Sequence, residues 1–297
     1  MNKTLFLRML FLLSAFLLLV CACSDPTRLE TVEPDLVDES NGLPLNDPAA
    51  DDRNDETVVE PAEPEKILWP RIGIYAGLGS WDINVLTAER FFEHYEVQYE
   101  LFDEQDAIDG SINQDFDLIW FPGGFAAEYK YLIPNHENIR LFVEEGGIFV
   151  GSCAGAYYAS SVLRWLGTDH PYPLELFEGK AVGPLAGEIG WGEIAKLSLE
   201  PGHPVNAEFD ATLDVYYFDG PYFEAYDSSS VQILARYAIN NEPAVIVGRY
   251  ETGKYLLLGP HPELGGYTPE SPDFNIDGGE GAQWSWLYAA LIWICNW

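Results

Sequence analysis

A cysteine enclosed by glycines at the end of an apolar run is the feature that most constrains how this chain folds. Residues 147–158 read GIFVGSCAGAYY, so a strand-type segment leads into Cys153, and Gly151 and Gly155 lie two residues to either side. A strand that turns sharply into a helix holds its central residue in a strained backbone conformation, and only small residues fit around that corner. The pattern therefore predicts a strand–turn–helix corner with Cys153 at its tip.

Cys153 at such a corner is a candidate nucleophile. A helix N-terminus carries partial positive charge and unbonded N–H groups, which favour a thiolate over a thiol. The N–H of Ala154 is a candidate donor to an oxyanion. The motif by itself leaves a second interpretation open, in which Cys153 is a buried structural cysteine, because free cysteines are often small core residues.

A second apolar segment, residues 253–259, ends in a turn that carries His261, Pro262 and Glu263. A cysteine nucleophile needs a base, and the base needs a third group that fixes its tautomer. His261 and Glu263 are the candidates for these two roles. In isolation, His261 is better explained as a turn histidine and Glu263 as a solvated surface carboxylate.

Together these motifs resemble the class I glutamine amidotransferase superfamily. More narrowly, they resemble the amidotransferase-like domain found at the N-terminus of eukaryotic biotin-protein ligases and in standalone bacterial proteins. The matching stretches, within roughly residues 70–266, are 72–80 (IGIYAGLGS), 121–124 (FPGG), 153–157 (CAGAY), 219–223 (DGPYF) and 259–263 (GPHPE). The resemblance implies a Cys153–His261–Glu263 triad with Gly124 and Ala154 as the oxyanion hole, although Pro122-Gly123-Gly124 alone also reads as a plain turn.

The remaining pattern predicts an α/β fold, a flavodoxin-like doubly wound and mostly parallel sheet with an antiparallel extension. The expected elements are strands at 71–76, 96–102 and 117–121, a helix capped by Ser80 that runs to Tyr95, a helix at 137–145, later strands near 194–199, 213–218, 231–237 and 244–250, and a buried helix at 283–294 that holds Cys295. In such sheets ligands bind beyond the carboxyl ends of the strands, where all three motifs fall.

The predicted pocket is lined by Gly123, Tyr157, Trp191 and Tyr222, although aromatic residues are also common in cores. The Gly- and Pro-rich residues 166–192 are expected to wall this pocket. No histidine or cysteine spacing in the folded part indicates a metal site, and no phosphate-binding or dinucleotide motif occurs, so no cofactor is expected.

The first residues predict export. Met1 to Val20 contains a basic start and a short apolar run, and Val20-Cys21-Ala22-Cys23 resembles a bacterial lipobox. We expect a signal peptide over 1–22, acylation of Cys23 with Cys21 as the alternative site, and a lipid anchor in a membrane of the cell envelope. An uncleaved anchor is the competing interpretation. Ser24 after the cysteine favours the outer membrane or cell surface, although the sequence does not decide between inner and outer membrane.

Acidic composition divides the rest of the chain. Residues 23–66 hold 14 acidic and 3 basic residues without an aromatic one, which predicts a disordered tether. Residues 67–297 form the expected amidotransferase-like domain. The whole chain has a formal net charge of −33 and would repel a phosphate backbone, so we do not expect it to bind nucleic acid.

These observations predict an exported lipoprotein that hydrolyses a small-molecule or peptide amide through a cysteine acyl-enzyme. One alternative is an envelope peptidase, and another is a binding or scaffolding lipoprotein that has kept the fold. The chain as given has no biotin-ligase catalytic domain, so the resemblance does not imply biotinylation. Neither the substrate nor the oligomeric state follows from the sequence.

Overall fold

The computed structural model describes residues 68–133, 135–265 and 282–297, which belong to one compact unit, Pro64–Trp297. The predicted signal peptide, the predicted tether and the two cysteines of the lipobox lie outside the described residues. Within the described ranges, no helix combines the length and the apolar character needed to cross a membrane.

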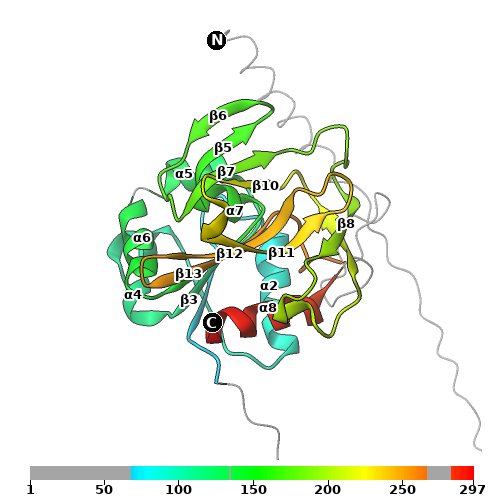
Figure 1. Cartoon of the computed structure of the whole chain (residues 1–297). Helices are drawn as coiled ribbons and strands as arrows, with labels where there is room; N and C mark the ends of the chain where they lie inside the picture. Colours follow the sequence, from blue (N-terminus) through cyan, green and yellow to red (C-terminus); the bar gives the residue numbers. More distant parts are fainter. Residues whose placement is uncertain (1–67, 134, 266–281) are drawn as a thin grey trace, which may run out of the picture. The chain divides into compact units, whose positions relative to one another are not determined.

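A nine-stranded sheet forms the centre of the domain (Figure 1). Its strand order is β2-β1-β3-β4-β13-β12-β11-β8-β9. The pairings from β2 to β13 are parallel, and those from β13 to β9 are antiparallel, which confirms the predicted fold class. The strands are β1 (Ile72–Tyr75), β2 (Glu100–Phe102), β3 (Leu118–Phe121), β4 (Ile148–Ser152), β8 (Glu193–Leu199), β9 (Thr212–Tyr217), β11 (Val231–Tyr237), β12 (Pro243–Tyr250) and β13 (Gly253–Leu258).

Alternating side chains of the parallel strands enter two separate cores. Leu118 and Trp120 pack on one face, whereas Ile119 and Phe121 pack on the other. The first face is covered by α2 (Asp82–His94) and α8 (Trp284–Asn296), which lie together below the sheet in Figure 1. The second face is covered by α3 (Glu104–Asp109), α4 (Ile112–Asp115), α5 (Ala126–Leu132), α6 (His136–Glu144) and α7 (Ala154–Ala159).

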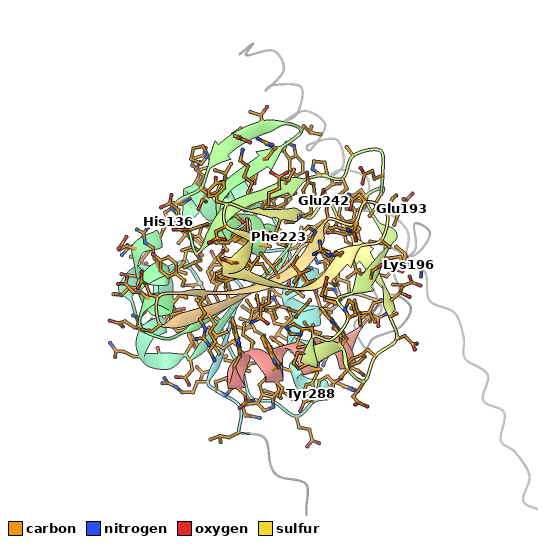
Figure 2. The ribbon with its side chains drawn as sticks, viewed as in Figure 1. His136, Glu193, Lys196, Phe223, Glu242 and Tyr288 are labelled. Carbon is orange, nitrogen blue, oxygen red and sulfur yellow. The ribbon has the colours of Figure 1, made fainter. Side chains whose placement is uncertain are left out.

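A second sheet of four strands also covers the second face, and the sequence pattern did not predict it. Its order is β10-β7-β5-β6, formed by β5 (Ser160–Trp165), β6 (Thr168–Pro171), β7 (Phe177–Gly183) and β10 (Tyr222–Ala225). Phe223 of β10 lies between the two sheets (Figure 2) and packs against Phe177 at 5.7 Å between ring centroids. Two single-turn 3₁₀ helices, η1 (Pro204–Asn206) and η2 (Ser228–Ser230), complete the described elements.

Two predicted boundaries were wrong. Trp81, and not Ser80, is the N-cap of α2, because the Ser80 hydroxyl donates to the Gly77 carbonyl at 2.6 Å and closes the preceding turn. The second strand begins at Glu100 instead of residue 96, since Glu96 has a positive φ of 54° and the Val97 N–H donates back to Phe92 at the end of α2.

The apolar tail forms the predicted buried helix, α8. Trp286, Leu287 and Leu291 are buried in the core beneath the sheet. Cys295 is only partly buried, and both Cys153 and Cys295 are free thiols. A disulfide between them, which would remove Cys153 from chemistry, is therefore absent from the described residues.

Candidate active site

Cys153 occupies the predicted strained corner between β4 and α7. Its φ of 47° and ψ of −100° lie outside the regions that side chains normally adopt, and such a conformation costs about 1–3 kcal/mol. The flanking glycines permit the tight packing. A Cβ on Gly155 would lie 2.1 Å from the Phe121 carbonyl oxygen, and one on Gly151 would lie 2.7 Å from the Gly155 backbone.

His261 reaches Cys153 because β13 and β4 are parallel neighbours. Leu258 pairs with Ser152, and the Cys153 N–H donates to the Leu258 carbonyl at 2.8 Å. The segments that follow β4 and β13 therefore leave the sheet side by side. The His261 N–H then donates to the Tyr216 carbonyl at 2.9 Å, which fixes the turn against the end of β9.

His261 and Glu263 form a buried pair. Nδ1 of His261 lies 2.8 Å from Oε1 of Glu263, and the two residues are 0% and 1% exposed. Burial lowers the pKa of His261, but the charges of Glu263 and Cys153 outweigh it and raise that pKa to about 10. His261 is therefore an imidazolium at neutral pH, and its Nδ1 proton goes to Glu263.

The other ring nitrogen of His261 is available for chemistry. Nε2 is buried and has no hydrogen-bond partner among the described residues. Cys153 is 7% exposed, its Sγ lies 3.5 Å from the Phe218 carbonyl oxygen, and its charge contributes to the raised pKa of His261. An imidazolium whose Nδ1 is fixed by a carboxylate stabilises a neighbouring thiolate, which is the nucleophilic form of cysteine.

Asn84 belongs to this site, and the sequence reasoning missed it. Its side chain, fully buried on α2, places Nδ2 3.3 Å from Glu263 Oε1 and 3.0 Å from His261 Nδ1. Because Nδ1 of an imidazolium is itself a donor, the amide donates to the carboxylate. The signal was available in the helix pattern, since Asn84 shares the buried stripe of Ala88 and Phe91.

The two predicted oxyanion-hole residues both have an unused N–H. Within the described part of the chain, the N–H groups of Gly124 and Ala154 donate to no acceptor. The Gly124 turn is fixed by two bonds to the loop before α2: Trp81 N–H donates to Gly123 at 3.0 Å and Phe125 N–H donates to Gly79 at 2.8 Å. A Cβ on Gly124 would lie 2.0 Å from the Gly79 oxygen, so only glycine fits.

The four predicted pocket residues differ in how near they lie. Gly123 contacts the imidazole, because a Cβ there would be 2.5 Å from His261 Cε1. Tyr157 is buried, and its hydroxyl donates to the Asp219 carbonyl at 2.8 Å. The preceding carbonyl, that of Phe218, is the one close to Cys153 Sγ. Trp191 packs on the Phe218 ring at 4.9 Å, and that ring packs on His261 at 5.5 Å.

Tyr222 is the exception among the pocket residues. Its hydroxyl bonds to the exposed Glu224 carboxylate at 3.3 Å, and its backbone pairs with Val182 in the small sheet. The neighbouring Gly220 does touch the His261 turn, because a Cβ there would lie 1.8 Å from the Gly259 oxygen. Across the described ranges, no group of three or more His, Cys, Asp or Glu side chains is arranged to hold a metal ion.

Comparison with known proteins places these features in one family. The family described as "Biotin-protein ligase, N terminal" matches residues 74–275. A Chlamydia muridarum protein described only as uncharacterized is 30% identical over 163 residues, which are 52% of this chain and 61% of that protein. A biotin–protein ligase of Schizosaccharomyces pombe is 25% identical over 169 residues, which are 50% of this chain and 25% of that protein.

Similarity to solved structures supports the fold. A glutamine amidotransferase crystal structure superposes with a TM-score of 0.51 at 17% identity, covering 76% of this chain and 99% of that one. The match at this identity shows a shared amidotransferase-like architecture. The aligned residues cover 61% and 25% of the two sequence relatives, which is less than two thirds of either.

Proposed function

The chain belongs to the family described as "Biotin-protein ligase, N terminal", and we propose that its amidotransferase-like domain hydrolyses an amide through a cysteine acyl-enzyme. Cys153 is the nucleophile, His261 the proton carrier and Glu263 the residue that orients His261. The observation that carries this proposal is the buried 2.8 Å contact between His261 and Glu263 beside a cysteine in strained backbone geometry. Strain of this kind persists where the surrounding structure maintains it and is concentrated at functional sites.

The first half of the reaction forms the acyl-enzyme. The Cys153 thiolate attacks the amide carbon, a C–S bond forms, and the carbonyl electron pair moves to oxygen. The Gly124 and Ala154 N–H groups stabilise this oxyanion. As the intermediate collapses, the C–N bond breaks and His261 gives its Nε2 proton to the departing nitrogen, which leaves as ammonia or an amine.

The second half restores the enzyme. Neutral His261 takes a proton from a water molecule, and the resulting hydroxide attacks the thioester carbon. The C–S bond then breaks, its electron pair returns to sulfur, and the carboxylic acid product leaves. Glu263 keeps its contact with Nδ1 and stabilises the imidazolium in both halves.

The narrow access to Cys153 favours a terminal carboxamide over an internal peptide bond. Cys153 is 7% exposed, and both His261 and Glu263 are buried, so little of the site faces solvent. An amide at the end of a side chain or chain terminus presents its carbonyl through a small opening, whereas an internal peptide bond requires an open groove on both sides. This favours amidase chemistry over the envelope peptidase alternative.

Export and lipid anchoring remain part of the proposal. The lipobox-like Val20-Cys21-Ala22-Cys23 motif supports acylation of Cys23 and attachment to a membrane of the cell envelope, with the acidic residues 23–66 as spacer. Mass spectrometry of the mature N-terminus tests this. A diacylglyceryl group on Cys23 that is lost in Cys23→Ser supports it, and an unmodified chain that begins at Met1 contradicts it.

The triad is tested by the rate at which iodoacetamide labels Cys153 in the whole chain, measured by peptide mass spectrometry against pH. Fast labelling at pH 6 that falls about 10²-fold in His261→Ala is expected, in line with the usual contribution of a paired base. Slow labelling that is indifferent to His261 would leave a binding or scaffolding protein. Ammonia release from carboxamides, absent in Cys153→Ala, then identifies the reaction.

A further inference from the structure

An aromatic layer leads from the triad to the surface. The Phe218 ring packs on His261, and Trp81 and Trp191 pack on Phe218 at 6.0 and 4.9 Å between ring centroids. Trp191 is 53% exposed, so this layer begins in the core and ends in solvent. Exposed rings next to a reactive centre provide a binding face for apolar groups and for cations.

The turn that contains Gly124 carries a second exposed aromatic ring. Phe125 directly follows Gly124 and is 49% exposed, although its N–H is held by the Gly79 carbonyl. Trp81 links the two sides, since its N–H donates to Gly123 while its ring touches both Trp191 and Phe218. Apolar surface therefore lies both along the His261 side and next to the Gly124 N–H.

Among the described residues, no lysine or arginine side chain bonds to a triad residue. Every Lys and Arg side chain of the described residues bonds to an acceptor elsewhere in the domain, and none of these acceptors is a triad residue or a neighbour of one. Residues 266–281, which the structure does not describe, contain neither lysine nor arginine in the sequence. The charges that the described site does hold, apart from the imidazolium, are carboxylates such as Glu263 and Asp219.

Asp219 is a partly buried carboxyl residue next to the aromatic layer. It follows Phe218 directly, has a positive φ of 59°, and is only partly exposed. Partial burial raises the pKa of its carboxyl group, and no cationic side chain contributes to that pKa. A substrate carboxylate near Cys153 would find no lysine or arginine partner among the described residues, which costs binding free energy in a partly buried site.

We infer that the substrate is an amide whose flanking group is apolar or cationic and carries no carboxylate. Free glutamine, with its α-carboxylate, is therefore not the substrate. This inference rests on the proposed function and adds the substrate class. A terminal carboxamide of a peptide, or an amide that bears an aromatic or amine group, fits both the narrow access and the aromatic layer.

Matched thiol reagents of different charge test the substrate class at Cys153 itself. The whole chain in detergent is labelled with iodoacetate, iodoacetamide and N-benzyliodoacetamide, and the rates at Cys153 are divided by those of free glutathione in the same solution. We expect iodoacetate to be disfavoured about tenfold relative to iodoacetamide, because local potential changes encounter rates by such factors. The benzyl reagent should react fastest.

Two variants and one control locate the residues responsible for the preference. Trp191→Ala should remove the advantage of the benzyl reagent, whereas Tyr226→Ala, at an exposed aromatic residue directly after β10, should leave that advantage in place. Phe125→Arg, which keeps the backbone bond to Gly79, should raise the iodoacetate rate toward that of iodoacetamide.

The outcomes separate the two levels of proposal. Fast, His261-dependent labelling with equal rates for all three reagents would overturn the substrate class and leave the triad intact. Slow labelling by every reagent, unaffected by His261→Ala, would overturn the triad and the substrate class together. A preference for iodoacetate would also overturn the inference, and would indicate an anionic substrate such as glutamine.

Discussion

Oε1 of Glu263 accepts a hydrogen bond from Nδ1 of His261 over 2.8 Å, with only Pro262 between the two residues in the chain. The short His-Pro-Glu turn therefore brings acid and base together without help from a distant element. Both side chains are fully desolvated, so each charge depends on the other. Removal of either partner would leave a buried charge without compensation.

Replacement of Glu263 by glutamine should lower the pKa of His261. In the native protein the charges of Glu263 and Cys153 hold that pKa at about 10 against the opposing effect of burial. Without the carboxylate, burial dominates, and the pKa should fall to or below the ordinary value of about 6.5. NMR titration of the ring nitrogens measures it. Cys153→Ala should lower it by a smaller step, and an unchanged pKa in Glu263→Gln would contradict the assigned pairing.

The same pair should make stability depend on pH. Because the pKa of His261 is raised on folding, the folded state binds its proton more tightly than the unfolded chain. This contribution is complete below about pH 6.5, where both states are protonated, and it is lost as pH rises toward about 10. Denaturant unfolding should show that the difference between the native protein and His261→Gln shrinks from pH 6 to pH 9.5. A difference that grows with pH would contradict the raised pKa.

Asn84 should act as a positioning residue for Glu263. Its amide donates to Oε1 from the buried face of α2, and loss of that donor should cost about 1–3 kcal/mol of stability. In Asn84→Ala, the pKa of His261 and the labelling rate of Cys153 should both change. Thr87→Val is the matched control, because Thr87 is buried one turn later on the same helix and bonds only to the Ile83 carbonyl. It should lose stability without altering the pKa or the labelling rate.

The Cys153 corner, the His-Pro-Glu turn and the central sheet could be predicted because each has a recognisable local sequence pattern. Glycines beside Cys153 are required by contacts shorter than 3 Å, and alternation along residues 118–121 follows from two buried faces. The role of Asn84 was harder to predict. A polar residue on the buried face of a helix indicates a functional role only when its hydrogen-bond partners are known. Those partners lie 177 and 179 residues away.

The four-stranded sheet could not be predicted for a different reason. The inward positions of β7 are Phe177, Gly179, Ala181 and Gly183, so glycine hides the period of two that marks a strand. β6 is exposed along its entire length and shows no alternation at all. A Cβ on Gly183 would lie 1.8 Å from the Tyr157 hydroxyl oxygen. Position 183 therefore requires glycine because of a tertiary contact, which the sequence alone does not reveal.

Replacement of Gly123 by alanine should displace the imidazole. The added Cβ would lie 2.5 Å from His261 Cε1, and the buried ring has no room to move away without losing Glu263. Overpacking should cost about 1–3 kcal/mol, and labelling of Cys153 should slow. Gly73→Ala provides the control, because its Cβ would meet the Phe116 ring at 2.9 Å in the core of the second sheet face. That variant should lose stability while the relative labelling rate stays native.

The C-terminal helix should contribute directly to the triad through Trp284. Its indole Nε1–H donates to the Glu263 carbonyl at 2.7 Å inside the core and so fixes the turn that carries the acid. Trp284→Phe removes this donor, and we expect a stability loss of about 1–3 kcal/mol together with slower labelling of Cys153 and a lower pKa of His261.

Trp286 offers the matched control two residues further along the same helix. Its indole donates to Asn206 Oδ1 at 2.9 Å, also within the core, but far along the chain from the triad turn. Trp286→Phe should therefore cost similar stability, measured by denaturant unfolding, while the pKa of His261 and the labelling rate remain native. Equal effects of the two variants on Cys153 would mean that α8 supports the domain as a whole and does not position Glu263.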